Sequence, residues 1–107
     1  MPLNFSPCVL IPCYNHGAMM SRVLARLQPF GLHCIVVDDG SDFRTQQELE
    51  RLAAASANMT LIRLPINSGK GAAVIRGMQT AAEAGFSHAV QVDADGQHAL
   101  EDIPKLL

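Results

Sequence analysis

Four short apolar runs, separated by longer segments with helical periodicity, constrain the fold of this chain more than any other feature. The runs cover residues 8–13, 33–38, 59–64 and 87–92, and the segments between them cover 18–28, 45–57 and 70–84. Nearly continuous apolar strands that alternate with helices are typical of a parallel sheet covered on both faces. Right-handed crossovers then predict a doubly wound, three-layer α/β/α domain.

The third helical segment has a narrow face for packing. Its positions at helical spacing are Val74, Gly77, Met78 and Ala81, and we expect this face to meet the sheet. A glycine in a helix interior costs about 1 kcal/mol relative to alanine. We therefore expect close packing of the helix against the sheet to compensate for Gly77.

The size and charge of the chain narrow the classes of function. The 107 residues suit one domain, which we expect to cover 1–107. Charged residues make up 17% of the chain and the net charge is −2, which argues against a nucleic-acid partner. The first residues lack the pattern of a signal peptide, and no apolar run approaches the ~20 residues that span a bilayer. We expect a cytoplasmic protein whose membrane association, if any, is peripheral at the inner face.

Three cysteines, Cys8, Cys13 and Cys34, lie in or beside apolar runs. The odd number and the absence of a CxxC pair favour buried, reduced thiols. A metal or redox site is the alternative that the sequence leaves open.

Polar residues follow each of the four predicted strands. They stand at 12–16 (PCYNH), 38–41 (DDGS), 67–71 (NSGKG) and 93–96 (DADG). Parallel strands bring their carboxyl ends to one edge of the sheet, and ligands bind there in open α/β sheets. The sequence therefore predicts one site built from four separate segments.

Asp93 and Asp95 have the pattern of ligands for a hard cation. Two carboxylates separated by one residue can hold Mg²⁺ or Mn²⁺, which prefer oxygen ligands and often share them with a diphosphate. Such an ion neutralises charge that develops on a phosphate leaving group. A solvated turn rich in aspartate is the alternative interpretation.

Asp39 and Lys70 are the other charged candidates. Asp39 can accept a hydrogen bond from a ribose hydroxyl or a base N–H, although the same segment suits a turn in which Ser41 or Asp42 caps a helix. Lys70 stands where a helix begins, a position suited to phosphate. The segment is not a Walker A loop, because Leu64 stands where that motif needs glycine.

Taken together, four blocks resemble family 2 glycosyltransferases: PCYNH at 12–16, VDDGS at 37–41, NSGKGAA at 67–73 and DADGQH at 93–98. Their order and spacing agree with the family over nearly the whole chain. The last block is most similar to the branch that contains dolichyl-phosphate mannosyltransferase and polyprenyl-phosphate glycosyltransferases. His16 departs from the family pattern, in which glutamate is usual.

The resemblance implies a Rossmann-like GT-A half-domain with a mostly parallel four-stranded sheet in the order 3-2-1-4. It implies an inverting transfer of sugar from a nucleotide-diphosphate sugar to an acceptor hydroxyl, with Mg²⁺ or Mn²⁺. Its site residues are Pro12, Tyr14, Asn15, Asp39, Lys70 and Asp93 for the nucleotide sugar, and Asp95 with Asp93 for the metal.

The resemblance also implies what the chain lacks. The catalytic carboxylate of the family lies in a second half of the domain, and no residue here matches it. We expect the chain to bind nucleotide weakly without turnover, and to self-associate through the open edge of the fourth strand. The sequence leaves UDP, GDP and dTDP open as the nucleotide. A lipid-linked molecule is the preferred acceptor.

Two other classes remain as alternatives. One is a nucleotide-binding or structural module without catalysis. The other is a phosphatase of the haloacid dehalogenase type, whose DxDG[TS] motif is similar to the segment 93–96; here that segment follows the fourth strand, and Gln97 replaces threonine or serine.

Overall fold

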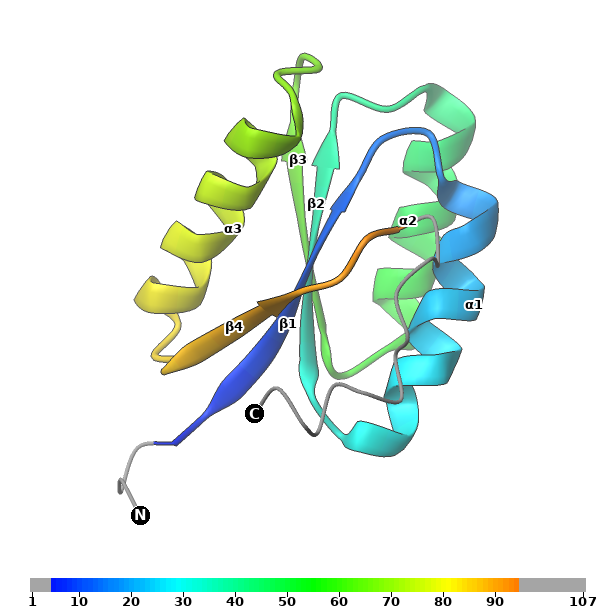
Figure 1. The fold of residues 1–107 in the computed structure, drawn as a ribbon. Coiled ribbons are helices and arrows are strands. Elements are labelled where there is room, and N and C mark those ends of the chain that lie inside the picture. The colour runs from blue at the N-terminus through cyan, green and yellow to red at the C-terminus, as the bar shows by residue number, and fades with distance from the viewer. Residues whose placement is uncertain (1–4, 95–107) are drawn as a thin grey trace.

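The computed structural model describes residues 5–94. Within this range four parallel strands form one sheet in the order β3-β2-β1-β4 (Figure 1). The strands are β1 (Pro7–Cys13), β2 (His33–Asp39), β3 (Met59–Leu64) and β4 (His88–Gln91). The predicted architecture and strand order are confirmed.

Helices cover both faces of the sheet (Figure 1). The helices are α1 (Gly17–Leu27), the short 3-10 helix η1 (Gln28–Phe30), α2 (Phe43–Ala55) and α3 (Lys70–Glu83). α1 and α2 pack on one face and α3 on the other. α2 begins two residues before the predicted position, because Asp42 caps it: the Thr45 backbone N–H donates to Asp42 Oδ1 at 2.9 Å.

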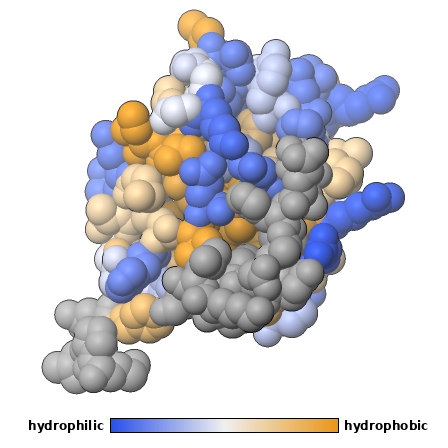
Figure 2. Space-filling view, in the orientation of Figure 1, coloured by the Kyte–Doolittle hydropathy of each residue, from blue (hydrophilic) through white to orange (hydrophobic). Residues whose placement is uncertain are grey.

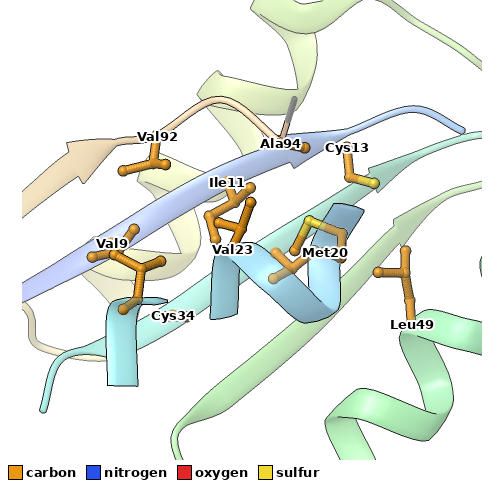
Figure 3. Packing of buried hydrophobic residues seen from close by; sticks show 11 residues of the cluster. Val9, Ile11, Cys13, Met20, Val23, Cys34, Leu49, Val92 and Ala94 are labelled. Carbon is orange, nitrogen blue, oxygen red and sulfur yellow. The ribbon is translucent and has the colours of Figure 1, made fainter. Parts of the chain in front are cut away.

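The alternation of side chains along the strands divides the core into two clusters. Val9 and Ile11 of β1 face α1, where Met20 and Val23 pack against them (Figure 3). Leu10, between them in sequence, faces α3 with Ile35 and Val37 of β2. Both clusters are buried, so the sheet holds its register firmly.

α3 lies unusually close to the sheet. Its buried residues are all small, namely Ala73, Gly77 and Ala81, and a Cβ atom at position 77 would collide with Leu10 Cδ1. This confirms the predicted close packing at Gly77. The predicted burial of Met78 is wrong: its exposed fraction is 49%, because small side chains one turn apart take the contact with the sheet.

Apolar and hydrophilic residues are distributed unevenly over the surface. In the space-filling view, apolar residues are visible on the side where α3 lies, and hydrophilic residues predominate near the loops at the top (Figure 2). None of the helices in residues 5–94 is long and apolar enough to cross a bilayer.

Candidate functional site

A cleft of about 250 Å³ lies at the carboxyl edge of the sheet. The loops after β1, β2 and β3 meet at this edge, at the top of Figure 1. The predicted site residues that line the cleft are Pro12, Tyr14, Asp39, Lys70 and Asp93. The topology thus brings together residues from four segments.

The carboxylate of Asp39 organises the loop between β3 and α3. Oδ1 accepts from the Ser68 backbone N–H at 2.7 Å, and Oδ2 accepts from the Gly69 backbone N–H at 2.9 Å. The Asn67 side-chain amide donates both to Oδ2 at 3.2 Å and to the Asp39 backbone carbonyl at 3.0 Å. Asp39 is only 3% exposed, so these bonds also stabilise a nearly buried charge.

The neighbouring carboxylate, Asp38, lies on the opposite face of the strand. It accepts from the Ser41 backbone N–H at 3.0 Å and from Arg63 Nε at 3.3 Å. Arg63 also pairs with Glu50 of α2 at 3.0 Å. Asp38 is fully buried and joins β2 to β3, while Arg63 extends the link to α2, so the contacts of Asp38 are structural.

Close backbone contact joins the loops after β2 and β3. Gly40 has a positive φ of 69°, and a Cβ atom there would collide with the backbone nitrogen of Asn67. Glycine meets both demands, since it has no Cβ atom and adopts positive φ readily.

Asn15 stands beside the cleft without lining it. Its φ is 57°, which asparagine tolerates better than most residues. Its backbone N–H donates to Ser41 Oγ at 2.9 Å, and its Oδ1 accepts from the Asp42 backbone N–H at 2.8 Å. Asn15 therefore fixes the loop after β1 against the loop after β2.

Lys70 and Asp93 form an ion pair in the cleft. Lys70 Nζ lies 2.7 Å from Asp93 Oδ1, and the Gln91 side chain donates to the same oxygen at 3.5 Å. Asp93 thus already accepts a cationic group, as a metal ligand must. Among residues 5–94 no cluster of three or more His, Cys, Asp or Glu side chains could hold a metal. The second predicted ligand, Asp95, lies outside the described residues.

Two further residues of the predicted segment 12–16 line the cleft, although neither was among the individual site residues. Cys13 lines the cleft, and burial raises the pKa of its thiol to about 11, so it is not a nucleophile at neutral pH. His16, which departs from the family pattern, also lines the cleft. Cys8 and Cys34 are buried as well, and all three cysteines are free thiols, as predicted.

Asn67, Gly69 and Ala94 complete the lining; they lie in the segments predicted to meet at this edge, although none was among the individual site residues. Asn67 and Gly69 belong to the NSGKG segment, so their position after a strand was the available signal. The long-range pairing of Asn67 with Asp39, 28 residues away, has no local signal in the sequence.

These features define a GT-A type domain: a parallel sheet in the order 3-2-1-4 with a charged cleft at its carboxyl edge. A mannosyltransferase from Pyrobaculum calidifontis, solved in complex with GDP-Man and Mn²⁺, has the same fold. Its TM-score is 0.68 at 23% identity, over 90% of this chain and 29% of that protein.

The chain belongs to glycosyl transferase family 2, which it matches over residues 8–107. It is 36% identical over 112 residues to the UDP-N-acetylglucosamine–dolichyl-phosphate N-acetylglucosaminyltransferase of Methanococcus voltae, covering 92% of this chain and 45% of that protein. It is 33% identical over 102 residues to the polyprenol monophosphomannose synthase of Mycolicibacterium smegmatis, covering 92% of this chain and 38% of that protein. The chain therefore spans less than half the length of these relatives.

Proposed function

We propose that this chain forms the donor-binding part of an inverting glycosyltransferase that uses a nucleotide-diphosphate sugar. The main support for this proposal is the cleft, because it brings Asp39, Lys70 and Asp93 from three separate motifs to one edge of the sheet. Carboxylates suited to a base or a metal, beside a cation suited to phosphate, are what such a donor requires.

The nucleoside would lie at the Asp39 end of the cleft. Asp39 would accept from the base, while Pro12 and the half-exposed ring of Tyr14 would bound the pocket. An aromatic ring in this position can stack on a base face. Asn15 would shape the pocket through its contacts with the loop after β2.

The diphosphate would lie at the Lys70 end. Lys70 would turn from Asp93 to the phosphates, and Asp93 with Asp95 would hold Mg²⁺ or Mn²⁺. When bound, that ion supplies positive charge that stabilises the departing diphosphate.

A lipid phosphate is the acceptor that the relatives favour, in place of the hydroxyl expected from the sequence. One relative is named for dolichyl phosphate and another for polyprenol monophosphomannose. A phosphate monoester is largely dianionic at neutral pH, so it needs less help from a base than a hydroxyl does. Such an acceptor places the reaction at a membrane surface.

The second candidate function is nucleotide binding without transfer. Two carboxylates line the cleft in residues 5–94, and both are already engaged: Asp39 by the Asn67–Gly69 loop and Asp93 by Lys70. Both carboxylates are occupied by protein groups, which disfavours transfer to any acceptor that needs a general base. Detection of sugar transfer by this chain would exclude this candidate.

The testing experiment is a calorimetric titration of the chain with GDP, UDP and dTDP, each with and without Mn²⁺. We expect at least one nucleotide to bind, more tightly with Mn²⁺, and the gain from Mn²⁺ to be lost in Asp93→Asn and Asp95→Ala. Asp42→Asn is the matched control, because Asp42 caps α2 outside the cleft lining. No binding by a cooperatively folded sample would overturn the proposal.

We also propose that the chain self-associates along β4. Within residues 5–94 this strand pairs only with β1, which leaves one of its edges open. Sedimentation velocity over a range of concentrations tests this, and a monomer at every concentration would contradict it.

A further inference from the structure

We infer that Asn67 reads the nucleobase together with Asp39, and that the pair selects guanine. The inference rests on the proposed nucleotide-binding function and extends it to the identity of the base. The basis is the set of hydrogen-bond donors and acceptors on these two side chains that no other protein group uses.

The orientation of the Asn67 side chain is settled by its neighbours. Its amide group lies 3.0 Å from the Asp39 backbone carbonyl oxygen and 3.2 Å from Asp39 Oδ2. A carbonyl oxygen can only accept, so the nitrogen of the amide must face it, and its two N–H donors are both used there. The side-chain oxygen of Asn67 is therefore the atom left for a ligand.

That oxygen is available. Asn67 is exposed and lines the cleft, and no donor within residues 5–94 meets its Oδ1. An amide oxygen accepts up to two hydrogen bonds and donates none.

Asp39 has room for one more donor. A carboxylate offers about four lone-pair positions. Ser68 fills one on Oδ1, while Gly69 and Asn67 fill two on Oδ2. One position on Oδ1 remains. This end of the cleft therefore presents two adjacent side chains, each with an acceptor and neither with a spare donor.

Guanine complements this pair best. Its Watson–Crick edge carries two adjacent donors, the N1–H and the 2-amino group, which match one acceptor on Asp39 and one on Asn67. Uracil and thymine carry a single N–H between two carbonyl oxygens. If that N–H met Asp39, a carbonyl oxygen would face the Asn67 oxygen, and two acceptors would repel.

Inosine diphosphate isolates the contact to Asn67, since inosine differs from guanosine only in lacking the 2-amino group. We expect GDP to bind this chain, in Mn²⁺, about fivefold more tightly than inosine diphosphate, which is the value of one hydrogen bond. UDP and dTDP should bind at least tenfold more weakly than GDP. In Asn67→Ala the advantage of GDP over inosine diphosphate should disappear.

Ser68→Ala is the matched control, because the Ser68 backbone N–H still donates to Asp39 and the fivefold ratio should persist. Equal binding of GDP and inosine diphosphate, a ratio unchanged in Asn67→Ala, or tighter binding of UDP would overturn this inference while leaving the proposed function intact. Failure of every nucleoside diphosphate to bind would overturn both. The comparison of the two purine nucleotides in the unaltered chain decides the question even if Asn67→Ala does not fold.

Discussion

The ammonium group of Lys70 lies 2.7 Å from Oδ1 of Asp93, 23 residues further along the chain. Lys70 is the first residue of α3 and Asp93 follows β4, so the pair joins two separate segments across the cleft. The side chains are 59% and 28% exposed, and a pair in such contact with water contributes at most about 1 kcal/mol to stability. The value of Lys70 should therefore appear in ligand binding rather than in folding.

Lys70→Met should weaken binding of a nucleoside diphosphate about tenfold, because it removes the cation proposed to meet the phosphates. The free energy of unfolding should change by less than about 1 kcal/mol. Calorimetric titration gives the first quantity and urea denaturation gives the second.

Arg76→Gln is the matched control for Lys70→Met. Arg76 is also an exposed cation on α3, but it does not line the cleft. If both substitutions weakened binding equally, the effect would come from net charge and not from the position of Lys70.

The hydrogen bonds between Asp39 and the Asn67–Gly69 loop should contribute directly to the free energy of unfolding. Asp39→Ala removes the acceptor of three N–H groups, and we expect a loss of about 2 kcal/mol in the free energy of unfolding. Urea denaturation measures the loss. Hydrogen exchange should also show faster exchange of the Ser68 and Gly69 backbone amides, since their acceptor is gone.

Asp42→Ala is the control that distinguishes loss of the Asp39 hydrogen bonds from a general loss of stability. This change removes the cap of α2 and should cost about 1 kcal/mol. The amides of Ser68 and Gly69 should then keep their native exchange rates. Faster exchange in both variants would show that the loop depends on overall stability and not on Asp39.

Local patterns in the sequence predicted most of the fold. β-branched runs marked the strands, and the polar segments after them predicted a site at one edge of the sheet. Parallel topology explains why these segments meet, because it brings the carboxyl end of every strand to the same edge of the sheet. A cap of α2 at Ser41 or Asp42 and close packing at Gly77 followed from the chemistry of single residues, and the structure selects Asp42 as the cap.

Contacts between distant loops could not be predicted in this way. The bonds of Asn15 to the loop after β2, and of Asn67 to Asp39, join segments 26 to 28 residues apart. The face of α3 was misassigned at Met78 for a related reason. Periodicity favours the larger apolar side chain, whereas the short distance between α3 and Leu10 admits only small ones.

Buried thiols should make the protein less stable at high pH. Burial raises the pKa of Cys13 and of Cys34 from the ordinary 9.0 to about 11. Each folded thiol therefore keeps a proton that the unfolded chain loses above pH 9. This contribution to stability is complete below pH 9 and is lost as the pH rises to 11, on the order of 2 kcal/mol per thiol. Urea denaturation at pH 8, 9, 10 and 11 measures it.

Lysine and tyrosine also titrate in this range, so the informative quantity is a difference between variants. Cys34→Ala should be less stable than the unaltered chain at pH 8 and should lose less stability between pH 9 and 11. Parallel curves for the two proteins would mean that Cys34 does not contribute to the alkaline loss.

Gly77→Ala should destabilise the protein, against the usual gain from replacing glycine in a helix. The added Cβ would collide with Leu10 Cδ1, and overpacking of this kind costs about 1–3 kcal/mol. Gly71→Ala, near the start of the same helix, meets nothing within 4 Å and should stabilise by about 0.5 kcal/mol.

Leu10→Ala tests whether the collision is the cause. Alone it removes a fully buried side chain and should cost about 2–5 kcal/mol. Combined with Gly77→Ala it also makes room for the new methyl group, so the double variant should be at least about 1 kcal/mol more stable than the sum of the two single effects predicts. Urea denaturation of the four proteins provides this cycle. Strict additivity would show that Gly77 is required for a reason other than its contact with Leu10, and that the close approach of α3 to the sheet does not depend on this pair.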